Sequence, residues 1–171
     1  MSVTVAAAYK NMVTTNEFNK ETIRFSGLKW ELSNNLFNEF VAPIERNDIY
    51  NLSVCLSEEL YCISKLNNIV GLINTKNFSF VESICTVLEK QNSVFKLIED
   101  SKNYEKIFKI INETKAILNG INSSIVLSTK NCLKSTEQPL LHYAVISGFF
   151  DIYKSVDETF GEIQRVVINN N

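Results

Sequence analysis

Three polar residues, Glu59, Gln91 and Thr114, interrupt rows of apolar residues that predict inward-facing helix surfaces. If the helices fold back as consecutive hairpins, Glu59 lies opposite a position near Val94, and Gln91 lies opposite one near Asn112. The three side chains would then share one layer of the core. A buried carboxylate has a raised pKa and needs hydrogen-bond donors, which Gln91 and Thr114 can supply.

Two interpretations of these three residues are open. As a polar core layer, Glu59, Gln91 and Thr114 would fix the register of the packed helices. Alternatively, the three side chains lie at the edge of the bundle and reach solvent. Charged groups are seldom fully buried, so general burial preferences favour the edge position.

Histidine-based catalysis would have to use His142, because the chain has one histidine. Cys132 is the nearest thiol in sequence, and Lys130 and Lys134 are its only local cations. No glycine-rich turn or nucleophile motif surrounds it, so nothing in the sequence marks the thiol as activated. We therefore expect His142 to be a structural residue at a helix start.

Acidic pairs and cofactor motifs give no catalytic pattern either. Adjacent carboxylates occur at Glu58-Glu59, Glu99-Asp100 and Asp157-Glu158. Neighbouring side chains on a helix point apart, so these pairs should not converge on a substrate. The chain has no CxxC, Glu-x-x-His, GxGxxG, P-loop or GxSxG motif. We expect no enzyme, catalytic residue, cofactor or metal site.

The elements that position these residues are helices. Three successive stretches between Asp48 and Lys130 carry apolar residues seven apart, with a second apolar position in between. The first stretch has the rows Ile49, Leu56, Ile63, Val70 and Leu52, Leu66, Ile73. Only a helix brings such positions onto one face. We predict a single all-α domain over residues 1–171: an antiparallel bundle of five to seven helices with three long central helices.

Helix boundaries follow from capping and stop signals. Asp48 is the predicted N-cap of a helix reaching about Asn74, and Ser79 with Glu82 forms a predicted capping box. A third long helix opens at Ser101, and a final pair is expected at about 140–147 and 149–167. Near the N-terminus we predict helices over about 3–13 and 22–32. The second has a strand-like alternation as its alternative. Ser33 or Asn34 can mark a new helix start, and the helix that follows is expected to end near Val41, before Pro43.

Composition excludes several classes of protein. Apolar residues make up 45% of the 171 and charged residues 21%, which predicts a folded globular chain. A net charge of -2 offers no basic face for nucleic acid. The sequence lacks a signal-peptide pattern and a membrane-spanning segment, so we expect a cytoplasmic protein with reduced cysteines. Abundant Asn and Lys suggest an AT-rich genome, as in many viruses, parasites and symbionts.

One segment carries a family resemblance. The run 139–153, Pro-Leu-Leu-His-Tyr-Ala-Val-Ile-Ser-Gly-Phe-Phe-Asp-Ile-Tyr, resembles the T-P-L-H-x-A-x-x-x-G-x-x-x-I-V core of an ankyrin repeat. The matching positions are Leu141, His142, Ala144, Gly148 and Ile152. The run departs from the pattern at its first two positions and at its last, and no second copy is present. The resemblance implies protein binding and a structural role for His142. Because ankyrin units need neighbours, one unit would only cap the bundle, and a helix pair with similar packing is equally compatible.

Aromatic residues provide the remaining candidates for a contact site. Phe149 and Phe150 are adjacent, so both cannot face the same core, and Trp30 lies in the least regular region. Burial of both phenylalanines between two helix layers is the alternative. We expect a non-enzymatic helical module that binds a protein partner. A self-assembling coat or scaffold subunit and a carrier of an apolar ligand are the alternatives.

Overall fold

The computed structural model describes residues 1–14, 18–38, 44–70, 72, 78–98, 101–135 and 138–170. Their regular elements are all helical, which confirms the predicted all-α class and the range of five to seven helices. The helices are α1 (Ser2–Thr14), α2 (Phe18–Asn38), α3 (Arg46–Val70), α4 (Phe80–Leu97), α5 (Tyr104–Ser135) and α6 (Pro139–Asn169). A short 3-10 turn, η2 (Ser101–Asn103), precedes α5.

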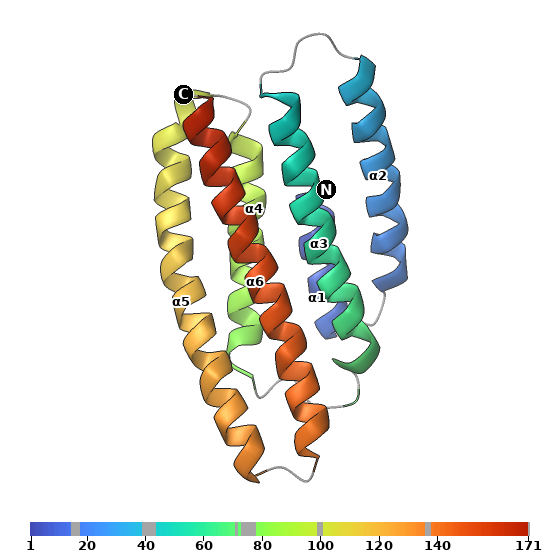
Figure 1. Cartoon of the computed structure of the whole chain (residues 1–171), viewed down its shortest axis with the longest axis vertical. Helices are drawn as coiled ribbons and strands as arrows, with labels where there is room; N and C mark the ends of the chain where they lie inside the picture. The colour runs from blue at the N-terminus through green and yellow to red at the C-terminus, as the bar shows by residue number, and fades with distance from the viewer. Residues whose placement is uncertain are drawn as a thin grey trace.

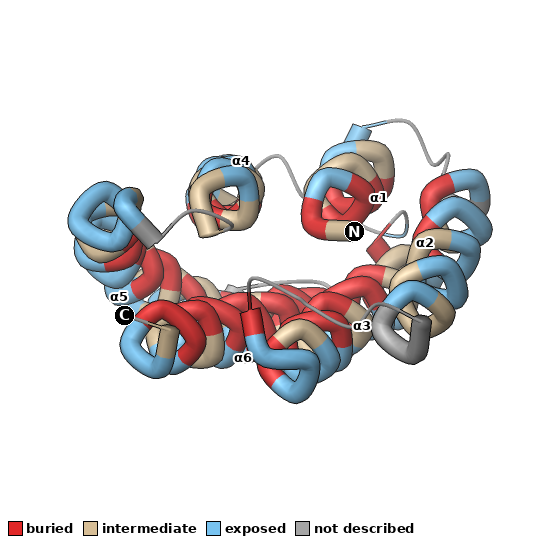
Figure 2. The backbone as a smooth tube through the Cα atoms, turned by 90° about the horizontal axis from the view of Figure 1, so that it is seen from above, coloured by how far each residue is buried: buried red, intermediate tan, exposed pale blue. Residues whose placement is uncertain are grey.

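The helices pack in two layers (Figures 1 and 2). In one curved layer α3 and α6 lie side by side, with α5 beyond α6 and α2 beyond α3. Helices α1 and α4 form the second layer, where α4 packs against α5, and α1 packs against α2, α3 and α4. Buried residues line the faces where the layers meet (Figure 2).

Two ion pairs fix the register of α3 against α6. Arg165 Nη2 lies 2.7 Å from Asp48 Oδ1, and Lys65 Nζ lies 3.1 Å from Asp151 Oδ2. The partners run in opposite directions along the two helices, so α3 and α6 are antiparallel. Asp48 is buried and also accepts a hydrogen bond from Asn170, whereas the Lys65 pair is exposed. Since its carboxylate is buried, although Arg165 is 42% exposed, the Asp48 pair contributes more to the register than the exposed Lys65 pair.

An aromatic cluster ties both layers together. The ring of Phe149 on α6 lies 5.3 Å from that of Phe80 and 6.4 Å from those of Tyr9 and Phe78, in edge-to-face geometry. The Tyr9 hydroxyl donates to the Val81 carbonyl at 3.0 Å, which satisfies the one polar atom of the cluster's rings. The cluster joins α1, α4 and α6, which are distant in sequence.

The predicted final helix pair is wrong, because α6 is one continuous helix through Gly148. This glycine packs against α3 and does not end a helix. A Cβ atom at Gly148 would lie 2.8 Å from Leu66 Cδ1 and 3.4 Å from Leu66 Cβ and Cγ. Glycine therefore allows α6 to approach α3 closely while remaining helical.

A side chain at this contact should destabilise the fold. We expect Gly148→Val to lower the free energy of unfolding by about 1–3 kcal/mol, because the fully buried Leu66 side chain must shift within the core to make room. Gly161 lies on the same helix with nothing within 4 Å of an added Cβ, so Gly161→Val is the matched control. Urea denaturation of both variants measures the difference, and equal midpoints would contradict the close-approach role.

The predicted Asp48 cap is also wrong, whereas Ser79 has the predicted N-cap position of α4 but lacks the capping hydrogen bond. Helix α3 begins at Arg46, so Asp48 lies inside its first turn, and its carboxylate binds α6. Ser79 has helical backbone angles, φ -58° and ψ -25°, and its side chain makes no capping hydrogen bond. A capping side chain needs an extended backbone to turn back onto the helix end. The helix ends predicted near Val41 and Asn74 lie outside the described residues.

Candidate functional site

The paired ends of α5 and α6 extend past α4. An ion pair of 2.8 Å between Lys90 and Glu113 sets the register of α4 against α5. Since α4 begins at Phe80, the antiparallel register places its start opposite a position near Ser123. About three further turns of α5 then run on with α6 beyond the start of α4, as Figure 1 shows. This part of the hairpin is not covered by α4.

A groove of about 310 Å³ lies between the two helices in this region, and we call it the α5–α6 groove. Its lining residues are Ile125, Val126, Thr129, Lys130, Tyr143, Ile146, Ser147 and Phe150. Ile125 and Ile146 are buried and form the floor, whereas Val126 and Tyr143 remain 45% and 49% exposed. The groove therefore presents apolar surface that an occupant could bury.

Positive charge borders this groove. Lys130 lines it, and Lys154 Nζ lies 5.6 Å from the centre of the Phe150 ring. Between Thr114 and Ser135 the α5 sequence carries three lysines and no acidic residue. An occupant with carboxylates beside its apolar face would match this arrangement.

The three contact residues predicted from the sequence, Trp30, Phe149 and Phe150, lie in three different environments. Phe150 is half-buried, lines the groove and stacks on Tyr153 at 5.7 Å between ring centres. Phe149 is 0% exposed, so it packs in the core and does not lie on a contact surface. Trp30 is 71% exposed on α2 and does not line the α5–α6 groove. The structure does not bring Trp30 and Phe150 together in one pocket.

A second polar feature lies inside the bundle. Glu59, Gln91 and Thr114 are 0%, 1% and 0% exposed, so the expectation of an edge position is wrong for all three. Gln91 Nε2 donates to both carboxylate oxygens of Glu59, at 3.1 and 3.0 Å. Thr159 on α6 donates to Glu59 Oε1. These bonds connect α3, α4 and α6.

Thr114 does not bind this carboxylate. Its hydroxyl donates to the Ile110 carbonyl of its own helix at 2.7 Å, as a buried threonine on a helix can do. Thr159, which was not among the residues predicted from the sequence, supplies the third member instead. The available signal was a polar interruption in an apolar α6 row, between Val156 and Ile163. The same reasoning that identified Glu59 could have found it.

Burial raises the pKa of Glu59 from its ordinary 4.5 to about 7, although hydrogen bonds from Thr159 and Gln91 lower it. Gln91 Oε1 is buried and has no hydrogen-bond partner. If Glu59 is protonated, its O–H can donate to this oxygen after the amide group turns over. Both the available acceptor at Gln91 and the raised pKa therefore favour protonation of Glu59 at or below neutral pH.

Histidine, cysteine and metal chemistry were further candidates. His142 lies in the first turn of α6, where its Nδ1 atom is 3.1 Å from the Gln138 carbonyl oxygen, a hydrogen bond of the Nδ1–H tautomer. The structure describes all four cysteines and joins none of them in a disulfide, and the Cys132 thiol donates to the Pro139 carbonyl. Among the described residues, no group of three His, Cys, Asp or Glu side chains could hold a metal ion. Nor is any described helix long and apolar enough to cross a membrane.

Comparison with known proteins adds no assignment. The chain matches no known protein family, and no curated protein sequence matches it significantly.

Proposed function

We propose that this chain is a non-enzymatic protein-binding module whose α5–α6 groove takes an amphipathic helix from a partner protein. The observation that carries the proposal is the α5–α6 groove itself, a hollow of about 310 Å³ between two helices with Val126 and Tyr143 exposed on its rim. A groove forms along two packed helices where no other helix covers them. The apolar face of an amphipathic helix can fill such a groove.

The shape and charge of the groove define the partner. About three turns of uncovered hairpin can hold apolar side chains at positions i, i+3 or i+4, and i+7 of a docked helix. Ile125 and Ile146 form an apolar floor for them, and Tyr143 provides an aromatic rim of the kind enriched in binding hot spots. Lys130 and Lys154 favour Asp or Glu on the flanks of the bound helix.

A displayed library of helical peptides tests this proposal directly. We expect selection against the protein to enrich peptides with an apolar i, i+3/i+4, i+7 face flanked by Asp or Glu. Val126→Glu places a carboxylate on the groove rim and should weaken an enriched peptide about tenfold or more, since losing a buried apolar anchor costs over 1.4 kcal/mol. Titration of a fluorescent peptide measures the dissociation constant.

Tyr61→Glu is the control, because Tyr61 is an exposed apolar residue on α3 and does not line the groove. It should leave peptide affinity unchanged. Failure to enrich any peptide, or equal binding by the Val126→Glu variant, would overturn the proposal. Light scattering across a concentration series tests the alternative occupant, since an assembly that Val126→Glu dissociates would mean that a second copy fills the groove.

A further inference from the structure

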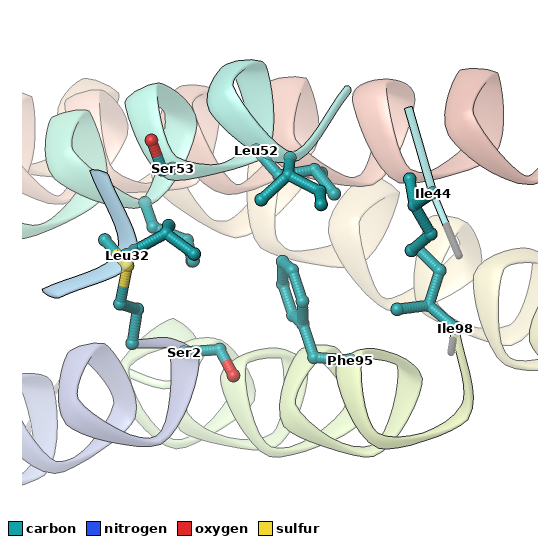
Figure 3. A pocket seen from close by; sticks show the side chains of 10 residues that line it. Ser2, Leu32, Ile44, Leu52, Ser53, Phe95 and Ile98 are labelled. Atoms are coloured by element: carbon teal, nitrogen blue, oxygen red, sulfur yellow. The ribbon is translucent and has the colours of Figure 1, made fainter. Parts of the chain in front are cut away.

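A second hollow lies on another part of the molecule, between α1, α2, α3 and α4 (Figure 3). Its volume is about 410 Å³. The residues that line it are Met1, Ser2, Leu32, Ile44, Ile49, Leu52, Ser53, Leu56, Phe95 and Ile98. Because four helices contribute, the space is bounded on several sides, and an occupant has to be small enough to lie between helices.

The described side chains that line this pocket are apolar or carry a hydroxyl. None of these ten side chains is ionisable, and Ser2 and Ser53 are the only hydroxyls among them. Met1 also carries the N-terminal amine, which is half-buried, and burial lowers the pKa of this amine and so favours its uncharged form. Ser53 donates to the Tyr50 carbonyl at 2.7 Å, so its hydroxyl is already satisfied. Figure 3 shows both serine oxygens pointing away from the space between Leu52 and Phe95. No lining side chain is suited to pair with a charged group on a ligand.

We infer that this pocket binds an uncharged, apolar small molecule, of the class that includes acyl chains and terpenes. Its volume lies in the range of about 300–1,000 Å³ found for small-molecule sites. The pocket is partly open to solvent, so its apolar lining is surface that a bound ligand could bury. The inference is independent of the α5–α6 groove, since the two sites share no lining residue.

Helix α2 is the wall that a ligand would stabilise most. Among its described side chains only Glu21 and Phe25 are buried, whereas Ile23 and Trp30 are 75% and 71% exposed. Its contribution to the pocket is Leu32. A ligand between Leu32 and α3 adds apolar contacts to a helix that has few, and binding to the folded state raises its stability by linkage.

An uncharged fluorescent probe, N-phenyl-1-naphthylamine, tests the inference. We expect its emission to rise on binding to the intact chain. Excitation of Trp30, the only tryptophan, should sensitise that emission, because Trp30 lies two residues from Leu32 on the wall. Displacement by 1-decanol or by farnesol then distinguishes a straight acyl shape from a branched terpene shape.

Filling the pocket supplies the decisive variant. Leu52→Phe enlarges a side chain that borders the space and should weaken dye binding at least tenfold, while Ser123→Phe on the exposed face of α5 should not. Leu32→Phe, on the half-buried wall of α2, replaces it if the helical circular dichroism of Leu52→Phe is lost. An unchanged dye signal with the intact chain, or equal binding by the folded Leu52 or Leu32 variants, would overturn the inference.

Discussion

Replacing Phe149 with alanine is expected to lower the free energy of unfolding by about 3–5 kcal/mol, the range for truncating a buried aromatic side chain. The Phe149 ring is fully buried and makes edge-to-face contacts with Tyr9, Phe78 and Phe80. Its removal leaves a cavity where α1, α4 and α6 meet, and rigid helices on three sides allow little collapse. Urea denaturation followed by circular dichroism measures the loss.

The neighbouring residue provides a matched control. Phe150 is half-buried and packs on Tyr153 at the surface of α6, so Phe150→Ala should cost only about 1 kcal/mol. The same variant should weaken a peptide bound in the α5–α6 groove, which Phe150 lines. A larger stability loss from Phe150→Ala than from Phe149→Ala would contradict the assignment of one residue to the core and the other to the surface.

The spacing of apolar residues was sufficient to predict the helices, because the buried positions of a helix recur every three to four residues. Along α3, the predicted inward residues Leu52, Leu56, Ile63, Leu66 and Val70 are buried in the structure. The predicted helices near the N-terminus are present as α1 and α2. Periodicity does not distinguish a glycine that ends a helix from one that permits a close approach. Gly148 is the second kind, and only the position of Leu66 on another helix reveals it.

The partners of buried polar groups could be predicted only in part. Two helices joined by a short turn fold back on each other, so positions equally far from the turn lie opposite. This rule placed Gln91 within a few residues of the position opposite Glu59. Helix α6 packs on α3 across about a hundred residues, so no local rule placed Thr159 beside Glu59. The groove could not be predicted either, because it depends on how α5 packs against α6.

Capping predictions failed for a related reason. Asp48 has the residue type of an N-cap, yet Arg165 and Asn170 of α6 bind its carboxylate. A tertiary ion pair outweighs a local cap when the carboxylate is buried, because an unpaired buried charge costs more than an unfilled cap. Asp48 does lie at the start of a helix, as predicted, but its partners are on a helix that is distant in sequence.

Glu59 should make stability depend on pH in the direction opposite to an ordinary paired carboxylate. Its pKa in the folded chain is about 7, above its ordinary 4.5, so folding takes up a proton between these values. The contribution of Glu59 is therefore fully present below pH 4.5 and is lost as pH rises through 7. The free energy of unfolding should fall by about 3 kcal/mol across this window, at 1.36 kcal/mol per pH unit.

Glu59→Gln isolates this effect from every other titrating group. The amide has no charge to desolvate, and its NH2 group can donate to the unpartnered Gln91 Oε1. The difference in unfolding free energy between this variant and the original chain should therefore grow by about 3 kcal/mol in favour of the variant from pH 4.5 to pH 7. Denaturant midpoints at several pH values measure it.

Glu58→Gln removes the same charge from the exposed side of the same turn and should follow the original chain at every pH. Glu59→Leu separates the hydrogen bonds from the charge, because it leaves Gln91 and Thr159 without their acceptor inside the core. If Glu59→Leu is stable but changes its oligomeric state, the polar contact specifies helix register. A constant difference between Glu59→Gln and the original chain would mean that the carboxyl group stays in one protonation state over this pH range.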